Sequence, residues 1–67
     1  MVEACNKQIK QALEIARKLI ILADEGEAVS QDDGCVLLYS VIRDCAYKIR
    51  TQGEREREAH KSRGAWR

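Results

Sequence analysis

Three cysteines and one histidine are the side chains of this chain whose types suit a transition metal: Cys5, Cys35, Cys45 and His60. Thiolates and imidazoles are the usual ligands of zinc. The cysteines are thirty and ten residues apart, which is not the CxxC spacing of a zinc site. On one helix, Cys35 and Cys45 would lie about 15 Å apart, too far to share an ion. We therefore expect no metal or other cofactor within one chain, and only a dimer that combines cysteines of two chains leaves that possibility open.

The same four residues have a simpler structural interpretation. Free cysteine is often buried and behaves as a small apolar side chain, so we expect Cys35 and Cys45 to be core residues. We expect His60, the sole histidine, to be a solvated helix residue rather than an acid or a base.

Five acidic residues without a base occupy the middle of the sequence: Asp24, Glu25, Glu27, Asp32 and Asp33. Their spacing does not supply the alternating ligands and the closing glutamate of a calcium-binding EF-hand loop. We interpret this segment as a solvated turn with helix-capping acids. The alternative is an electrostatic docking surface for a basic partner.

No arrangement of residues in the sequence is typical of catalysis. None of the serines, cysteines or carboxylates stands beside the histidine at a spacing that makes a nucleophile and base pair, and no glycine-rich phosphate-binding loop is present. Two helices do not enclose a pocket. The sequence therefore predicts that the protein is not an enzyme.

The candidate interaction surface is a row of aromatic and basic residues at steps of four, four and three: Tyr39, Arg43, Tyr47 and Arg50. Tyrosine and arginine are enriched at protein interfaces. The same residue types stack on bases and contact phosphates in nucleic-acid complexes. The row favours a protein contact, with nucleic acid as the less favoured alternative, because the glutamates that alternate with arginines after residue 53 reduce the positive field there.

The elements that must position these residues are helices. The 67-residue chain has no proline, 4% aromatic residues and 34% charged residues, which is typical of an all-α protein. Apolar residues recur at three- and four-residue steps over two segments, which predict helices at about Val2–Ala23 and Gln31–Gln52. The second helix is predicted either to end at about Gln52 or to continue to about Ser62. A short connection between helices of equal length predicts an antiparallel two-helix hairpin.

The connection carries recognisable signals for helix ends. Gly26 is the expected stop of the first helix. Ser30 and Asp33 have the spacing of a capping box, with aspartate in place of glutamate, which predicts that the second helix begins near Gln31. With the turn centred near Ala28, Cys5 would lie opposite Thr51.

The expected hairpin core on the second helix is the row that combines dense apolar residues with the helical repeat: Cys35, Leu38, Ile42, Cys45 and Ile49. Residues 1–52 form the predicted hairpin, and residues 53–67 a charged extension or tail that has no apolar face. The chain lacks the apolar run of a signal peptide, and its longest apolar run, Leu19–Ala23, is far below the roughly 20 residues that span a bilayer. We therefore expect a cytoplasmic protein without a membrane contact.

Several apolar residues remain after the two helices have paired, and we name four of them as candidate dimer contacts: Ile15, Leu22, Leu37 and Val41. Two hairpins placed together would bury this surplus and form a four-helix bundle, which is how short chains gain a sufficient core. The sequence therefore predicts a homodimer with twofold symmetry.

In its length and helix layout the chain resembles the Rop family of plasmid-encoded dimeric hairpins, which bind paired RNA loops, over about residues 2–51. The resemblance includes no shared motif, so no RNA-binding residue is transferred to this chain. It implies a dimeric four-helix bundle and, as the alternative function, RNA or DNA binding. The favoured interpretation is a small cytosolic homodimer that acts as a protein interaction or regulatory module with an unidentified protein partner.

Overall fold

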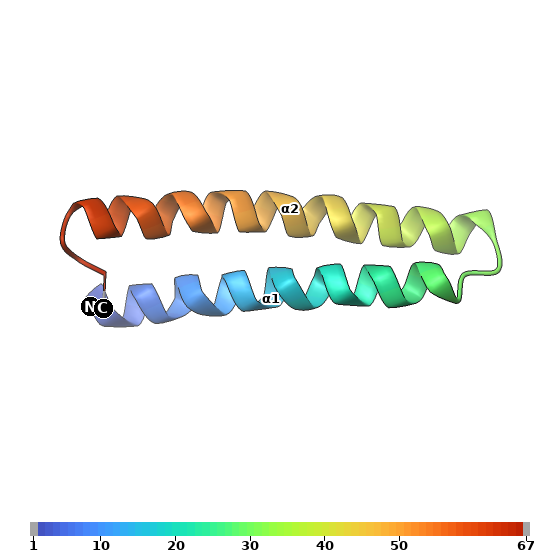
Figure 1. The fold of residues 1–67 in the computed structure, drawn as a ribbon, viewed down its shortest axis with the longest axis horizontal. Coiled ribbons are helices and arrows are strands. Elements are labelled where there is room, and N and C mark those ends of the chain that lie inside the picture. The colour runs from blue at the N-terminus through green and yellow to red at the C-terminus, as the bar shows by residue number, and fades with distance from the viewer. Residues whose placement is uncertain (1, 67) are drawn as a thin grey trace.

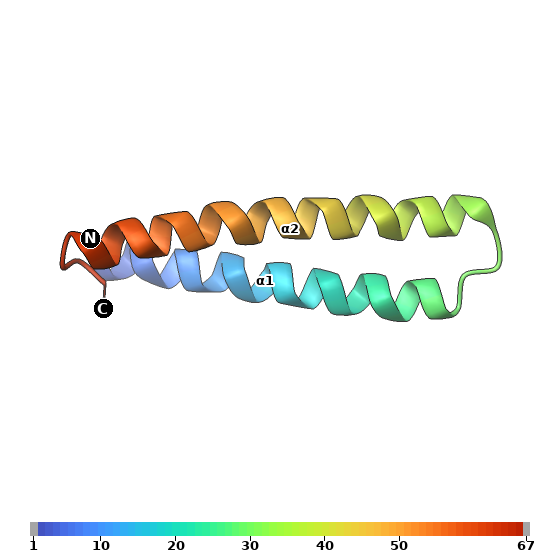
Figure 2. The same cartoon turned by 45° about the horizontal axis from the view of Figure 1, so that its top comes forward.

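The computed structural model describes residues 2–66 as two α-helices, α1 (Val2–Ala28) and α2 (Asp33–Ser62). The helices run antiparallel and side by side over their whole length, joined by one short loop (Figures 1 and 2). No strand occurs within the described residues. The predicted all-α helical hairpin is confirmed. The molecule is a narrow rod of 48 × 15 × 14 Å, and none of its described helices has the length and apolarity to cross a membrane.

The helix boundaries differ from the predicted ones near the loop. α1 does not stop at Gly26 but continues to Ala28, so the predicted stop is wrong. Gly26 faces α2, where a β-carbon would lie 2.2 Å from the Cε1 atom of Tyr39. The glycine therefore leaves room for the Tyr39 ring against α1. α2 passes Gly53 without a break and reaches Ser62, which is the longer of the two predicted ends.

The start of α2 is capped by Asp32 rather than by the predicted pair of Ser30 and Asp33. The Asp32 carboxylate accepts a hydrogen bond from the Cys35 backbone N–H at 2.8 Å, which satisfies a free amide of the first turn. The Ser30 hydroxyl instead donates to the carbonyl oxygen of Gly26 at 2.8 Å. The hydrogen bond from the Cys35 amide holds the pKa of Asp32 below its ordinary value.

The row of residues between the helices, here called the seam, consists largely of small side chains. Ala16, Ala23 and Ala46 are the fully buried apolar residues of the described chain. At Gly53, an added β-carbon would lie 2.8 Å from the Cδ2 atom of Leu13. Small residues let two helix backbones approach closely, so the seam is narrow and buries little large apolar surface.

The predicted core row of α2 is mostly wrong. Leu38, Cys45 and Ile49 are exposed, and only Ile42 and Cys35 are half-buried. The side of α2 that faces α1 is the neighbouring row, which carries Tyr39, Ile42, Ala46, Gly53 and His60. This row contains fewer large apolar residues, but its small members allow the closer contact between the helices.

The register of the hairpin also differs from the prediction. Asn6 contacts His60, and Gly26 contacts Tyr39, so the turn is centred several residues beyond Ala28. Cys5 therefore lies near the level of His60 rather than opposite Thr51. His60 is only 9% exposed, and the prediction that it is solvated is wrong because the end of α2 packs against the start of α1.

Candidate functional site

One side of the hairpin, here called the apolar side, carries exposed large apolar residues from both helices. Its α1 residues follow at steps of three, four and three: Ala12, Ile15, Leu19 and Leu22. Its α2 residues follow at steps of three, four and four: Leu38, Val41, Cys45 and Ile49. Such steps place residues on one face of a helix. Ala12 and Ile49 line the same groove, which shows that the two rows share one side of the hairpin.

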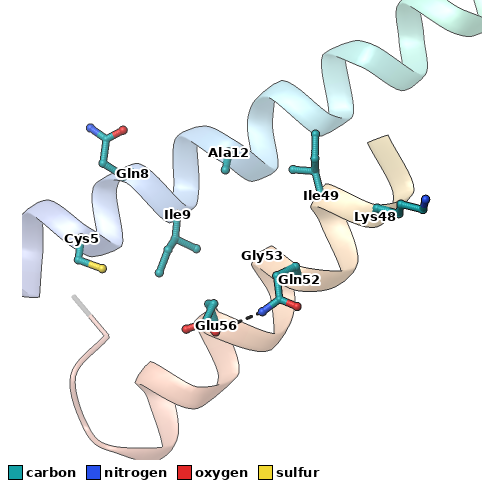
Figure 3. Close-up of a pocket in the computed structure, with 9 residues that line it drawn as sticks. All are labelled: Cys5, Gln8, Ile9, Ala12, Lys48, Ile49, Gln52, Gly53 and Glu56. Carbon is teal, nitrogen blue, oxygen red and sulfur yellow. Dashed lines mark hydrogen bonds between the residues drawn. The ribbon is translucent and has the colours of Figure 1, made fainter. Parts of the chain in front are cut away.

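The groove that contains Ala12 and Ile49 is a hollow of about 600 Å³ between the N-terminal half of α1 and the C-terminal half of α2 (Figure 3). Its lining residues are Cys5, Gln8, Ile9, Ala12, Lys48, Ile49, Gln52, Gly53 and Glu56. Two of these residues, Ala12 and Gly53, have little or no side chain. At its rim, the Gln52 side-chain amide donates to a Glu56 carboxylate oxygen at 3.3 Å. The groove thus has an apolar floor and a polar rim.

Three of the four candidate dimer contacts lie together on the apolar side. Ile15, Leu22 and Val41 are 54%, 47% and 51% exposed. The fourth, Leu37, is also exposed, but it lies about 100° around α2 from Leu38, toward the back of that helix. Sequence reasoning assigned Leu38 and Ile49 to the core and therefore missed that they enlarge this surface.

The opposite side of the hairpin, here called the basic side, has a shallower groove with three arginines. Its lining residues are Leu13, Arg17, Ile20, Ile21, Arg50, Glu54 and Arg57. Arg17 forms a two-pronged ion pair with Glu14, and its hydrogen bonds lower the pKa of the Glu14 carboxyl. Arg50 lies 3.5 Å from Glu54. Arg57 is held less closely, because its Nε atom lies 3.9 Å from Glu58 and has no hydrogen-bond partner.

The structure divides the predicted row of tyrosines and arginines into two parts. Tyr39 lies half-buried over Gly26. Arg43 bridges to Asp24 at 2.5 Å and to Glu27 at 2.9 Å on α1, and these bonds raise the pKa of its guanidinium. These two residues join the helices. Tyr47 and Arg50 remain on the surface, where the guanidinium carbon of Arg50 lies 4.8 Å from the centre of the Tyr47 ring.

A buried polar contact, which the sequence did not indicate, closes the end of the hairpin opposite the loop. The Asn6 side-chain amide donates to the Ala65 carbonyl oxygen at 2.6 Å, and its oxygen lies 2.5 Å from Nδ1 of His60. The Ala65 N–H donates to the carbonyl oxygen of His60. The Lys10 ammonium lies 5.1 Å from the centre of the Trp66 ring. We call Asn6, His60 and Ala65 the terminal latch. The signal that could have found it is the position of Asn6 three residues before Ile9 on the seam.

The candidate metal ligands are dispersed. Cys5 and Cys45 are exposed and Cys35 is half-buried, with its Sγ atom 3.7 Å from an Asp32 oxygen. Within residues 2–66, no three histidine, cysteine, aspartate or glutamate side chains are grouped closely enough to hold an ion.

Comparisons of this chain with known protein families, with curated proteins and with solved structures find no match. The resemblance to the Rop family therefore stays a likeness of length and helix layout.

Proposed function

We propose that the protein is a homodimeric helical hairpin in which two copies pair through their apolar sides into a four-helix bundle, and that this dimer is a protein interaction or regulatory module. The observation that carries the proposal is the apolar side itself. It presents Ile15, Leu22 and Val41, each about half exposed, on one surface. Contiguous exposed apolar surface of this kind marks protein interaction sites.

The solvent-accessible area of the chain supports a second copy of the chain as the partner that covers the apolar side. A compact folded protein of 7.6 kDa exposes about 4,300 Å² by the usual scaling of surface with mass. This chain exposes 4948 Å², an excess of about 650 Å² over that scaling. A standard protein interface buries about 800 Å² on each partner. One interface per chain would therefore return the surface to the ordinary range.

The small apolar surface that is buried in the seam also favours a dimer. The fully buried apolar residues of the described chain are three alanines, Ala16, Ala23 and Ala46. Burying one large aliphatic side chain contributes about 1.5–3 kcal/mol, and the apolar side offers several that a single hairpin leaves in water. A chain of this size rarely gains a sufficient core alone. Dimerisation supplies the missing apolar burial.

The basic side stays accessible in such a dimer and is the proposed surface for the protein partner. Tyr47 and Arg50 present a stacked aromatic and cationic pair there, and residues of these types carry much of the binding energy at interfaces. Arg17 and Arg57 extend the same surface. Arg57, whose Nε atom has no hydrogen-bond partner, is the group there that an acidic side chain of the partner would bind. The proposed compartment is the cytosol, where free thiols such as those of Cys5 and Cys45 stay reduced.

Nucleic acid is the less favoured partner. A nucleic-acid footprint is basic throughout, whereas Arg43 is neutralised by Asp24 and Glu27, and Arg17 by Glu14. Binding of RNA or DNA by the purified protein, with an affinity that falls steeply between low and physiological salt, would favour this alternative over a protein partner.

Sedimentation velocity on the purified protein at micromolar concentration tests the dimer. We expect a species of twice the 7.6 kDa chain mass that dissociates only on dilution. A folded species of 7.6 kDa throughout this concentration range would refute the proposed assembly.

A further inference from the structure

We infer that the two hairpins of the proposed dimer lie with their loops at opposite ends, about a twofold axis that passes near Leu19 and Cys45, so that the loop end of each chain covers the groove of the other. The inference rests on the proposed dimer and specifies its arrangement. Three observations carry it: the place of the apolar residues along the rod, the distribution of charge, and the shape of the groove.

The apolar residues of the apolar side are not centred on the hairpin but lie toward its loop. They extend from Ala12 to Leu22 on α1 and from Leu38 to Ile49 on α2, whereas the same side nearer the termini carries polar residues such as Gln8 and Gln52. Leu19 and Cys45 lie at nearly the same level, because Gly26 is paired with Tyr39. The apolar sides of two copies overlap most fully when the twofold axis that relates the copies passes near these two residues.

The apolar sides of two copies can overlap in two arrangements. In one the loops of the two copies lie at the same end of the dimer, and in the other they lie at opposite ends. Residues 24–33 contain five acids and no base. Asp24 and Glu27 share the charge of Arg43, so the segment stays acidic, whereas residues 48–67 have a net charge of +4. Loops at the same end would bring two acidic segments together. Loops at opposite ends bring the acidic loop of each chain toward the basic terminal part of the other, which is electrostatically favourable. The charge distribution selects this second arrangement.

The selected arrangement also fills the groove. With the axis near Leu19 and Cys45, the loop end of each chain reaches the level of Ile9 and Gln52 of the other, where the groove lies. The loop itself begins with an apolar residue, Val29, which follows directly after α1 and is 74% exposed. Val29 and Leu38 of the partner subunit would cover the apolar floor of the groove, which is incomplete in a single chain.

The positions of the cysteines make the arrangement measurable. The two copies of Cys45 would meet near the axis, within reach of the roughly 4.4–6.8 Å Cα separation of a disulfide. The two copies of Cys5, fourteen residues from Leu19 on α1, would lie about 40 Å apart at opposite ends of the dimer. Both thiols are exposed in the single chain, so they differ in position rather than in accessibility.

The test uses two matched variants with one cysteine each: Cys5→Ser with Cys35→Ser, which retains Cys45, and Cys35→Ser with Cys45→Ser, which retains Cys5. Each full-length variant is treated with copper–phenanthroline as the oxidant, and covalent dimers are measured on a non-reducing denaturing gel. We expect the variant that retains Cys45 to form covalent dimers at least ten times faster, as a rough estimate for a thiol pair held within bonding distance. In guanidinium chloride the two rates should become equal, because the difference depends on the folded dimer.

A second measurement uses the salt dependence of the dimer dissociation constant in the wild-type protein. Attraction between acidic and basic ends is screened by salt, so we expect the dissociation constant to rise severalfold between about 20 and 200 mM sodium chloride. Repulsion between two acidic loops at the same end would make it fall instead.

The outcomes separate the arrangement from the dimer on which it rests. A monomer in sedimentation refutes the proposed function and the arrangement together. A dimer in which Cys5 forms covalent dimers as fast as Cys45, or which tightens as salt rises, refutes only the arrangement with opposite loops.

Discussion

Nδ1 of His60 lies 2.5 Å from Oδ1 of Asn6 although the two residues are 54 positions apart in the sequence. Both side chains are buried in a molecule whose other buried side chains are small. The contact joins the last two turns of α2 to the first turns of α1, and through the Asn6 amide it also holds Ala65. Two buried polar side chains that satisfy each other fix one register, because a shift of either helix would leave both unpaired.

Replacement of Asn6 by alanine should therefore destabilise the protein. The change leaves His60 and the Ala65 carbonyl without their partner, and an unsatisfied buried polar group costs about 1–3 kcal/mol. Urea unfolding monitored by circular dichroism measures the loss. A double-mutant cycle with His60→Ala should show strong coupling between the two positions, whereas Gln11→Ala on the exposed part of α1 should change the free energy of unfolding by less than about 0.5 kcal/mol. Additive effects of the two latch substitutions would mean that the contact is not formed in solution.

Replacement of Gly26 by alanine should also destabilise the protein, although the same change inside a helix ordinarily stabilises by about 1 kcal/mol. The reason is the Tyr39 ring, which a new β-carbon would approach to 2.2 Å. Overpacking of this kind costs about 1–3 kcal/mol. Thermal unfolding checks the sign of the effect. In a Tyr39→Ala background the Gly26→Ala change should regain its stabilising sign, and a stabilising effect in the wild-type background would contradict the close approach.

Replacement of Val41 by glutamate should shift the proposed dimer toward monomer. Val41 and Val36 are the same residue type on opposite sides of α2, and they are 51% and 45% exposed. A charge at Val41 would be buried between two apolar sides, which is strongly unfavourable. Sedimentation equilibrium should show a dissociation constant at least one hundred times higher for Val41→Glu, corresponding to about 2.7 kcal/mol, and little change for Val36→Glu. Equal effects of the two variants would place the interface elsewhere.

The cap at Asp32 should give the protein a stability that depends on pH below neutrality. The hydrogen bond from the Cys35 amide holds the pKa of Asp32 below its ordinary value of 3.8. A carboxylate whose pKa is lowered by folding contributes its stability above the unfolded value and loses it as the pH falls through the lowered value. Asp32→Ala should lower the Tm by about 5 °C at pH 7, and this difference from the wild type should shrink as the pH falls below the ordinary pKa of 3.8 and through the lowered one.

Asp32→Asn is the matched control for the cap. Asparagine caps a helix about as well as aspartate but does not titrate, so the Tm difference between Asp32→Asn and Asp32→Ala should be the same at pH 7 and pH 3. A difference between wild type and Asp32→Ala that did not depend on pH would show that the carboxylate is not the cap.

The helical hairpin could be predicted from the sequence because apolar residues recur at helical steps over two long segments. The seam could not, because the residues that form it are inconspicuous in an apolar pattern. Ala16, Ala23 and Ala46 are small, and Asn6 and His60 are polar. The prediction followed the larger residues Leu38 and Ile49, which face away from α1. What decided between the rows was how the side chains fit between the helices. The Tyr39 ring lies over Gly26 and Leu13 lies over Gly53, so the places of the small residues mattered more than apolarity.

The candidate surfaces were predictable to different degrees. Ile15 and Leu22 were recognised as surplus to the hairpin because they fall outside the main stripe of α1, and both are exposed. The ion pairs of Arg43 could not be predicted, because its partners Asp24 and Glu27 lie on the other helix. Which residues of the two helices are neighbours depends on the register of the hairpin. The register in turn depends on Gly26, whose usual role as a helix stop concealed its contact with Tyr39.

The narrow seam has a consequence for how this protein could change during evolution. The fully buried apolar residues of the described chain are alanines, so few large side chains connect one side of the hairpin with the other. Residues such as Leu22 and Arg50 lie on separate sides without a shared partner, and substitutions at such distant sites have independent effects. The apolar side and the basic side can therefore diverge separately, so that the hairpin could acquire a new partner on one side while the surface on the other stays the same.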